Sequence, residues 1–206
     1  MLEKGAVHLP MPDTYRSLEE LVRCEPAADF RFVILDRRSR VTIVAPHGGR
    51  IEPGTSQVAQ TIVGGEWNFF AFEGLKARGN SALHVTSTRF RHPELERLLN
   101  CSSVGVSVHG MAEPGLRIEV GGLNARLAGL VALELRRKRF DVHDAPPSRS
   151  ARNPENFINL VPGGGIQLEI SQELRTLLRE DPSLLLRCGG AVRSAIERYL
   201  NGDAPG

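Results

Sequence analysis

The sequence predicts an α/β fold: a single domain with a mixed β-sheet flanked by helices. Short runs of β-branched and aromatic residues alternate with amphipathic segments along the chain, and no unit repeats. The chain has 206 residues, of which 41% are hydrophobic, and this is enough apolar material for one sizeable core. We therefore expect one domain over residues 1–206, with its core at about residues 15–200 and polar tails at both ends.

Capping and turn residues delimit the elements expected in the first half of the chain. Ser17 and Glu20 form a capping box that opens a short helix. Pro93 suits the first position of another helix, and Gly64 is expected to end a third, for which Thr55 or Ser56 provides the cap. Helices are thus expected at residues 17–23, 55–63 and 93–99, and strands at residues 30–35, 41–44, 66–72 and 83–87.

The second half of the chain continues the alternation. Asn124 is expected to cap a helix with an apolar stripe, and Ser171 is expected to cap the helix that follows the last strand. Residues 1–15 and the Pro- and Ser-rich residues 144–154 are expected to be irregular. Helices are predicted at residues 124–138, 171–179 and 191–200, and strands at residues 103–108, 117–120 and 166–170.

Composition excludes several classes of function. The formal net charge is +2, from 26 basic and 24 acidic residues, and no basic patch is interleaved with aromatic residues, so nucleic-acid binding is not expected. No apolar run approaches the roughly 18 residues that span a bilayer, and Glu3 and Lys4 stand where a signal peptide would begin its apolar region. Three widely spaced cysteines form no CxxC pair. We therefore expect a cytoplasmic protein without disulfides or a membrane segment.

Residues 45–55 carry the strongest functional signal. Pro46 cannot continue the hydrogen-bond ladder of the strand at residues 41–44, and Gly48 and Gly49 permit a sharp turn. His47 and Glu52 are therefore expected on a loop at the carboxyl end of a strand, where α/β sheets place their ligands. An imidazole and a carboxylate at this spacing can converge on one metal ion. A histidine in a Gly-Gly turn is more commonly a plain turn residue, and this alternative stays open.

Two further residues extend the pattern. His109 follows an apolar strand and precedes Gly110, and with His47 and Glu52 it completes a ligand set that leaves zinc an open fourth position. Glu169 stands among apolar neighbours, where a carboxylate is costly to bury unless it is paired or functional. Taken singly, each is more commonly structural. Their convergence at strand ends favours a site, and His84 could line the same cleft or be an ordinary strand histidine.

Six segments carry a family resemblance, in one order along the chain. Together they resemble the poly-γ-glutamate hydrolase family, known from bacteriophages and bacilli and also labelled phage-related replication proteins. The resemblance runs from about residue 15 to residue 175. The segments are Pro46-His47-Gly48-Gly49-Arg50-Ile51-Glu52-Pro53-Gly54-Thr55, Phe72-Glu73-Gly74, Leu83-His84-Val85-Thr86-Ser87, His109-Gly110, Gly121-Gly122-Leu123 and Gly165-Ile166-Gln167-Leu168-Glu169-Ile170-Ser171.

The resemblance implies a zinc-carboxypeptidase-like fold with one zinc ion. It implies zinc ligation by His47, Glu52 and His109, and catalysis by Glu169. Asn159 ends a segment that matches a family Asn-x-x-Asn motif, and it is followed by Leu160 where a basic residue is expected. If that residue holds an anionic substrate in the family, the specificity here differs.

The expected activity is zinc-dependent hydrolysis of γ-glutamyl amide bonds by a metal-activated water, with Glu169 as the proton carrier. The partner is then an anionic glutamyl polymer or peptide, and the enzyme is expected to be a monomer. If the protein is phage-encoded, lysis would release it from the cell. Two alternatives stay open: a zinc amidase or deacylase for a small acylated amino acid, and a non-catalytic metal-binding module. A polyanionic substrate needs cations, and the substrate-binding candidates are Arg50, Arg78, His84, Arg89, Asn159 and Arg175.

Overall fold

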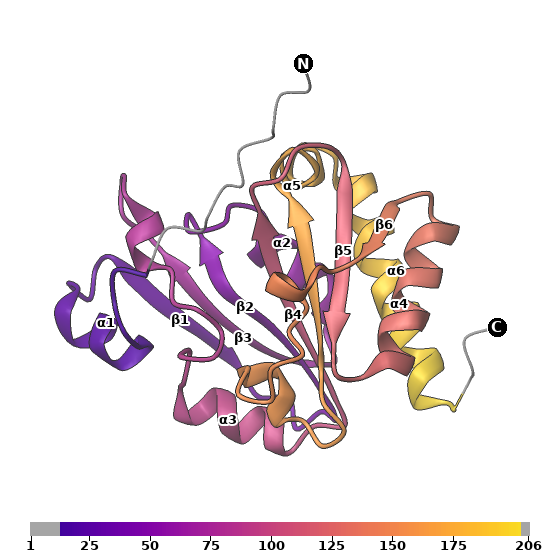
Figure 1. Ribbon diagram of the computed structural model, residues 1–206, viewed down its shortest axis with the longest axis horizontal. Coiled ribbons are helices and arrows are strands. Elements are labelled where there is room, and N and C mark those ends of the chain that lie inside the picture. The colour runs from indigo at the N-terminus through magenta and orange to yellow at the C-terminus, as the bar shows by residue number, and fades with distance from the viewer. Residues whose placement is uncertain (1–12, 203–206) are drawn as a thin grey trace.

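Seven strands pair into one mixed β-sheet in the part of the chain that the structure describes, residues 13–202 (Figure 1). In this computed structural model the strands lie in the order β1-β3-β2-β4-β7-β5-β6. The predicted α/β fold with a mixed sheet is therefore confirmed. The strand bounds are β1 Phe30–Leu35, β2 Val41–Gly49, β3 Asn68–Gly74, β4 Val104–Met111, β5 Arg117–Gly122, β6 Asp141–Asp144 and β7 Ile166–Ser171.

The sheet is parallel at its centre, and the strand direction reverses once on either side of it. Strands β3, β2, β4 and β7 run parallel to one another, whereas β1 pairs antiparallel with β3, and β5 pairs antiparallel with β7 and parallel with β6. The carboxyl ends of β2, β4 and β7 consequently meet at one edge of the sheet. In open α/β sheets this edge is where ligands bind.

Helices cover both faces of the sheet (Figure 1). Helices α2, α4, α5 and α6 bury their apolar sides against one face, in a core built from Val, Ile and Leu. Helices α1 and α3 pack on the other face, over an aromatic cluster that includes Phe70, Phe72 and Phe90. The helix bounds are α1 Leu18–Cys24, α2 Thr55–Val63, α3 Pro93–Asn100, α4 Ala125–Arg137, α5 Gln172–Glu180 and α6 Pro182–Leu200.

Helix starts with a strong local signal are confirmed. The Ser17 hydroxyl accepts a hydrogen bond from the backbone N–H of Glu20, and Asn124 caps α4 in the same way. Two other helices begin without a side-chain cap. Gly54 rather than Thr55 or Ser56 is the N-cap residue of α2, and the Thr55 hydroxyl donates to the carbonyls of His47 and Glu52. Ser171 is the N-cap residue of α5 as expected, but its hydroxyl donates to the carbonyl of Gly115 instead of accepting a bond from the helix.

Strands β2 and β4 extend further than predicted. The chain does not turn after Val44, because β2 continues to Gly49 and accommodates Pro46 by a shift of register against β3 between Ala45 and Gly48. His109 likewise lies inside β4 rather than beyond its end. Both histidines therefore project from sheet backbone, which is stiffer than the loops that we expected to carry them.

Two other expectations about secondary structure are wrong, and one strand was missed. Residues 83–87 do not form a strand: a 3-10 turn, Asn80–Leu83, leads there into irregular backbone. Helix α6 begins at Pro182 instead of residue 191, because Asp181 caps it through the backbone N–H groups of Ser183 and Leu184. Strand β6 was not predicted, since its four residues become a strand only by pairing with β5.

No helix within residues 13–202 combines the length and the apolar character that crossing a bilayer requires. The expectations for residues 1–12 and for the tail at 203–206 lie outside the described residues.

Candidate metal centre

The register of the sheet aligns a row of polar side chains across three strands. His109 on β4 is the register partner of Glu169 on β7, and Glu169 is in turn the partner of Glu119 on β5. Register partners on neighbouring strands point to the same face of a sheet. The row lies on the face opposite the Val, Ile and Leu core, because the residue before each member, Val108, Ile118 or Leu168, belongs to that core.

His47 and Glu52 face each other across the bend that joins β2 to α2. The Nδ1 atom of His47 lies 3.0 Å from Oε1 of Glu52, and its Nε2 lies 3.0 Å from the carbonyl oxygen of Val85. The bend is closed by the backbone N–H of Glu52, which donates to the carbonyl of His47. A carbonyl at one ring nitrogen fixes the tautomer and leaves the other nitrogen free to ligate a metal.

The second oxygen of Glu52 is also held. Its Oε2 accepts a hydrogen bond of 2.7 Å from the backbone N–H of Gly110, the residue after His109. This bond draws the β2–α2 bend towards the end of β4. Glu52 therefore links the two strands from which His47 and His109 project.

His109 is a buried histidine with one ring nitrogen that could bind a metal ion. Its ring centroid lies 5.0 Å from that of His47, and the side chain is buried. Its Nε2 atom is buried and finds no hydrogen-bond partner among residues 13–202. An unpaired polar atom in such a place is costly, and a metal ion beside it would remove the cost. The donor set of two imidazoles and one carboxylate thus fits a divalent transition metal.

His84 belongs to the same cluster. Its ring centroid lies 4.0 Å from that of His47, and its Nε2 lies 3.9 Å from Oε1 of Glu52. One ligand atom each from His47, Glu52 and His84 lie within 4.8 Å of one another. On its far side the Nδ1 of His84 pairs with Asp13 at 2.7 Å. His84 therefore lies among the residues able to hold a metal, rather than apart from them in an outer substrate cleft.

Electrostatics in the cluster favour the ligating forms of Glu52 and His109, whereas His47 must lose a proton to bind a metal. Burial favours the neutral form of Glu52, but the adjacent His47 outweighs burial and lowers the pKa of Glu52 to about 2. Burial and the neighbouring His47 lower the pKa of His109 to about 3. Burial also disfavours charge on His47, yet Glu52 outweighs it and raises the pKa of His47. A metal cation would take the place of the proton that Glu52 holds on His47.

Glu169 is a buried carboxyl group with a raised pKa. Its pKa lies well above the ordinary value because of burial and then the repulsion of Glu52, which together outweigh Arg149 and Gln167. The Nε2 of Gln167 donates a hydrogen bond of 2.7 Å to Oε1 of Glu169. A carboxylate held in this way can accept a proton near neutral pH and give it up again.

Sequence reasoning missed three residues around this carboxylate. Gln167 was detectable, because the alternation in Ile166-Gln167-Leu168-Glu169-Ile170 puts it on the same face as Glu169. Arg149 pairs with both oxygens of Glu119 and also contacts Glu113. No local sequence pattern predicts the network of Arg149, Glu119 and Glu113, since these residues come from three separate segments.

The predicted substrate-binding residues do not gather in one place. Arg50 is exposed and donates to the carbonyl of Lys76, and Arg89 pairs with Asp13. The amide of Asn159 donates to the carbonyls of Ala151 and Asn153, so it braces its own loop. Arg78 is exposed, whereas Arg175 is buried and bonded to main-chain carbonyls.

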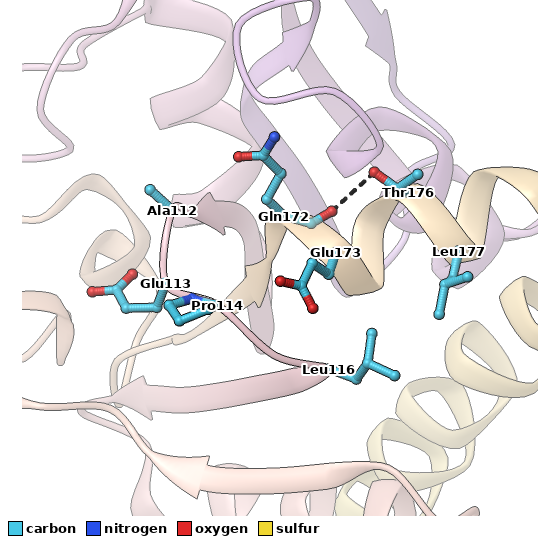
Figure 2. Close-up of a pocket in the computed structure, with 8 residues that line it drawn as sticks. All are labelled: Ala112, Glu113, Pro114, Leu116, Gln172, Glu173, Thr176 and Leu177. Atoms are coloured by element: carbon cyan, nitrogen blue, oxygen red, sulfur yellow. Dashed lines mark hydrogen bonds between the residues drawn. The ribbon is translucent and has the colours of Figure 1, made fainter.

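Two hollows lie beyond Glu52, along the start of α5. The nearer, of about 340 Å³, is lined by Glu52, Gly110, Arg175 and Arg179 among others. The farther, of about 540 Å³, lies between α5 and the loop after β4, and Figure 2 shows its lining. Ala112, Gln172 and Thr176 line both, so the two are continuous. The carboxylates of Glu113 and Glu173 line the farther hollow, and Glu113 is paired with Arg149, so the carboxylate of Glu173 is the charge that opposes a polyanion there.

The profile of the poly-gamma-glutamate hydrolase family matches residues 15–187. The chain belongs to this family. It is 36% identical over 171 residues to the Bacillus subtilis UPF0714 protein YndL, covering 81% of this chain and 67% of YndL. It is 33% identical over 174 residues to UPF0714 protein YmaC of the same organism, covering 82% of this chain and 74% of YmaC.

Solved structures agree with the family assignment. A bacteriophage poly-gamma-glutamate hydrolase superposes with a TM-score of 0.88 at 29% identity, over 93% of this chain and all (100%) of that one. The apo, zinc-free form of YndL gives 0.80 at 33% identity, over 92% and 98%. A Burkholderia mallei protein described as a putative carboxypeptidase gives 0.51 at 16% identity, over 93% and 63%. This last likeness concerns the fold alone, and it confirms the zinc-carboxypeptidase-like architecture.

Proposed function

We propose that this member of the poly-gamma-glutamate hydrolase family is a zinc hydrolase that cleaves γ-glutamyl amide bonds, in poly-γ-glutamate or in γ-glutamyl peptides. The observation that carries the proposal is the convergence of His47, Glu52 and the unpartnered Nε2 of His109 beside the buried carboxyl of Glu169. Two nitrogen ligands and one oxygen suit zinc better than calcium or magnesium, which prefer all-oxygen sites. The zinc-free description of the YndL structure supports the same metal.

The ligands in this proposal are His47 through Nδ1, Glu52 and His109. When bound, zinc supplies a Lewis acid that polarises the amide carbonyl and lowers the pKa of a water molecule towards about 7. Glu169 accepts the proton of the attacking water and delivers it to the leaving amine. Gln167 holds Oε1 of Glu169, so that Oε2 is the oxygen left to exchange the proton.

His84 takes the role of a neighbouring polar group in this arrangement. Its Nδ1–H is held by the Asp13 carboxylate, so a neutral His84 presents an unprotonated Nε2, 3.9 Å from Oε1 of Glu52, that can accept a hydrogen bond. Its side chain is 38% exposed, whereas that of His109 is buried and lacks a partner. We therefore assign the third ligand to His109.

The metal assignment is tested by elemental analysis of the purified protein and its single variants. Wild type should carry one zinc per chain, and His47→Ala, Glu52→Ala and His109→Ala should each lose metal and activity while keeping the fold. The fold should survive because the apolar core does not depend on zinc. His84→Ala should keep most of its zinc. Zinc loss in His84→Ala together with zinc retention in His109→Ala would transfer the third ligand to His84.

The substrate assignment is tested by incubating the protein with poly-γ-glutamate and following polymer size by size-exclusion chromatography. Cleavage should stop with a chelator and return when zinc is added back. Poly-α-glutamate is the matched control, because it carries the same charge on a different linkage. Equal cleavage of both polymers would contradict γ-linkage specificity, and cleavage of neither would contradict the polymer assignment.

A zinc amidase for a small acylated amino acid is the second candidate. The observation that favours it is the carboxylate of Glu173 in the farther hollow, since it opposes a long polyanion there. Turnover of a γ-glutamyl dipeptide but not of the polymer would select this alternative. In our proposal the enzyme acts as a monomer in either case.

A further inference from the structure

Arg175 is a buried arginine whose N–H groups donate to main-chain carbonyls. It lies in the first turns of α5 with 6% of its surface exposed. Its Nε donates to the carbonyl of Ile170 at 3.0 Å, its Nη1 to that of Pro53 at 2.7 Å, and its Nη2 to that of Met111 at 3.4 Å. The three carbonyls belong to three segments far apart in sequence.

Each of these carbonyls lies next to a residue of the proposed site. Pro53 directly follows Glu52, Ile170 directly follows Glu169, and Met111 lies two residues beyond His109. One planar guanidinium therefore binds the backbone just after Glu52, just after Glu169 and shortly after His109. We propose that Arg175 is a positioning residue that holds these three segments in the arrangement that binds the metal, a role that rests on the proposed function.

Arg175 packs closely against two glycines beside the proposed site, Gly54 and Gly110. A Cβ atom on Gly110 would lie 2.5 Å from both Cζ and Nε of Arg175, and one on Gly54 would lie 3.0 Å from its Cβ. The backbone N–H of Gly110 is the group that donates to Oε2 of Glu52. Arg175 thus packs against the peptide that orients a proposed ligand, and a side chain at position 110 would displace one or the other.

The geometry separates positioning from substrate binding. Nε, Nη1 and Nη2 each donate to a carbonyl, so three of the five N–H donors of the guanidinium are not available for a substrate carboxylate. A lysine carries a point charge on a flexible stem and cannot span three carbonyls as the guanidinium fork does. Lysine at this position should therefore restore only part of what arginine provides.

Arg193 provides a matched control. It lies on α6 and also donates to two main-chain carbonyls, those of Ile62 and Val63, at 2.9 and 3.0 Å. It stacks over Trp67, with 4.3 Å from Cζ to the ring centroid, and takes no part in the proposed site. Replacing it removes comparable contacts elsewhere in the fold.

The test measures zinc affinity without substrate, by competition with a chromophoric chelator, in wild type, Arg175→Met, Arg175→Lys and Arg193→Met. Arg175→Met should bind zinc about 10–100-fold more weakly, as is usual when a group that orients metal ligands is lost. Arg175→Lys should fall between it and wild type. Arg193→Met should melt at a lower temperature yet bind zinc as wild type does. The visible spectrum of the cobalt-substituted protein should change in Arg175→Met alone.

Wild-type zinc affinity and an unchanged cobalt spectrum in folded Arg175→Met would overturn the inference and leave the proposed function intact. A raised KM with unchanged kcat would assign Arg175 to substrate binding instead. If Arg175→Met does not fold, Gly110→Ala takes its place, and unchanged zinc affinity there would also overturn the inference. A wild-type protein that binds no zinc would overturn both proposals, whereas one that binds zinc without cleaving poly-γ-glutamate would contradict only the substrate.

Discussion

Strands β4, β5 and β7 carry different residues on their two faces. On one face, Val108, Ile118 and Leu168 pack into the apolar core beneath α2, α4, α5 and α6. On the other face, His109, Glu119 and Glu169 form a polar row, although each directly follows a core residue along the chain. The alternation of side chains along a strand thus assigns neighbouring residues to separate tasks.

The apolar face stabilises the sheet, and the rigid sheet in turn fixes the positions of the side chains on the polar face. A buried polar row is costly, since each member must find a partner or leave an atom unsatisfied, as His109 does. The large hydrophobic face offsets that cost. Substitutions on the polar face should therefore lower activity without lowering stability. Substitutions on the apolar face should lower stability without lowering the activity of the folded protein.

The largest effect is expected from Glu169→Gln on the polar face. Gln keeps the shape of the side chain but removes its basicity, so kcat should fall by about 10²–10⁴-fold, the usual contribution of a general acid–base group. Zinc content and melting temperature should stay near those of wild type. Steady-state kinetics, elemental analysis and thermal denaturation check the three readings. Loss of zinc would instead place Glu169 among the ligands and put the assignment of Glu52 in question.

Leu168→Ala, one residue earlier on the opposite face, should show the reverse profile. Leu168 is 1% exposed, and truncation of a buried leucine costs about 2–5 kcal/mol of unfolding free energy. Urea denaturation should show this loss, while turnover per folded molecule at low temperature stays close to wild type. A folded Leu168→Ala protein without activity would contradict the separation of the two faces.

The smallest effect concerns the thiols. Cys188 lies in the apolar core, and burial raises its pKa to about 12, whereas Cys24 and Cys101 are exposed. An aromatic disulfide reagent should therefore label two thiols quickly in the native protein and the third only on unfolding. Leu168→Ala should label Cys188 faster because the core is loosened, and Glu169→Gln should not. Equal labelling rates in these two variants would show that the faces are not independent.

The sequence was informative where the signal is local. The period-2 runs in β1 and β7, the capping residues Ser17 and Asn124, and Gly64 at the end of α2 depend on a few adjacent residues. Local backbone preferences are therefore enough to place these elements. Strand β6 and the extension of β2 through Pro46 were not predictable, because both depend on a partner strand from elsewhere in the chain.

The sequence by itself determined the fold class and the family, and it singled out His47, Glu52, His109 and Glu169, whose roles in a metal centre are our proposal. Strand periodicity and motif order carry that information without reference to distant parts of the chain. Only the tertiary structure decided that His84 lies against His47, that Asn159 braces a loop, and that Arg175 joins three segments. The physical reason is that these roles consist of contacts across 5 to 122 positions of sequence, which come together only once the sheet has formed.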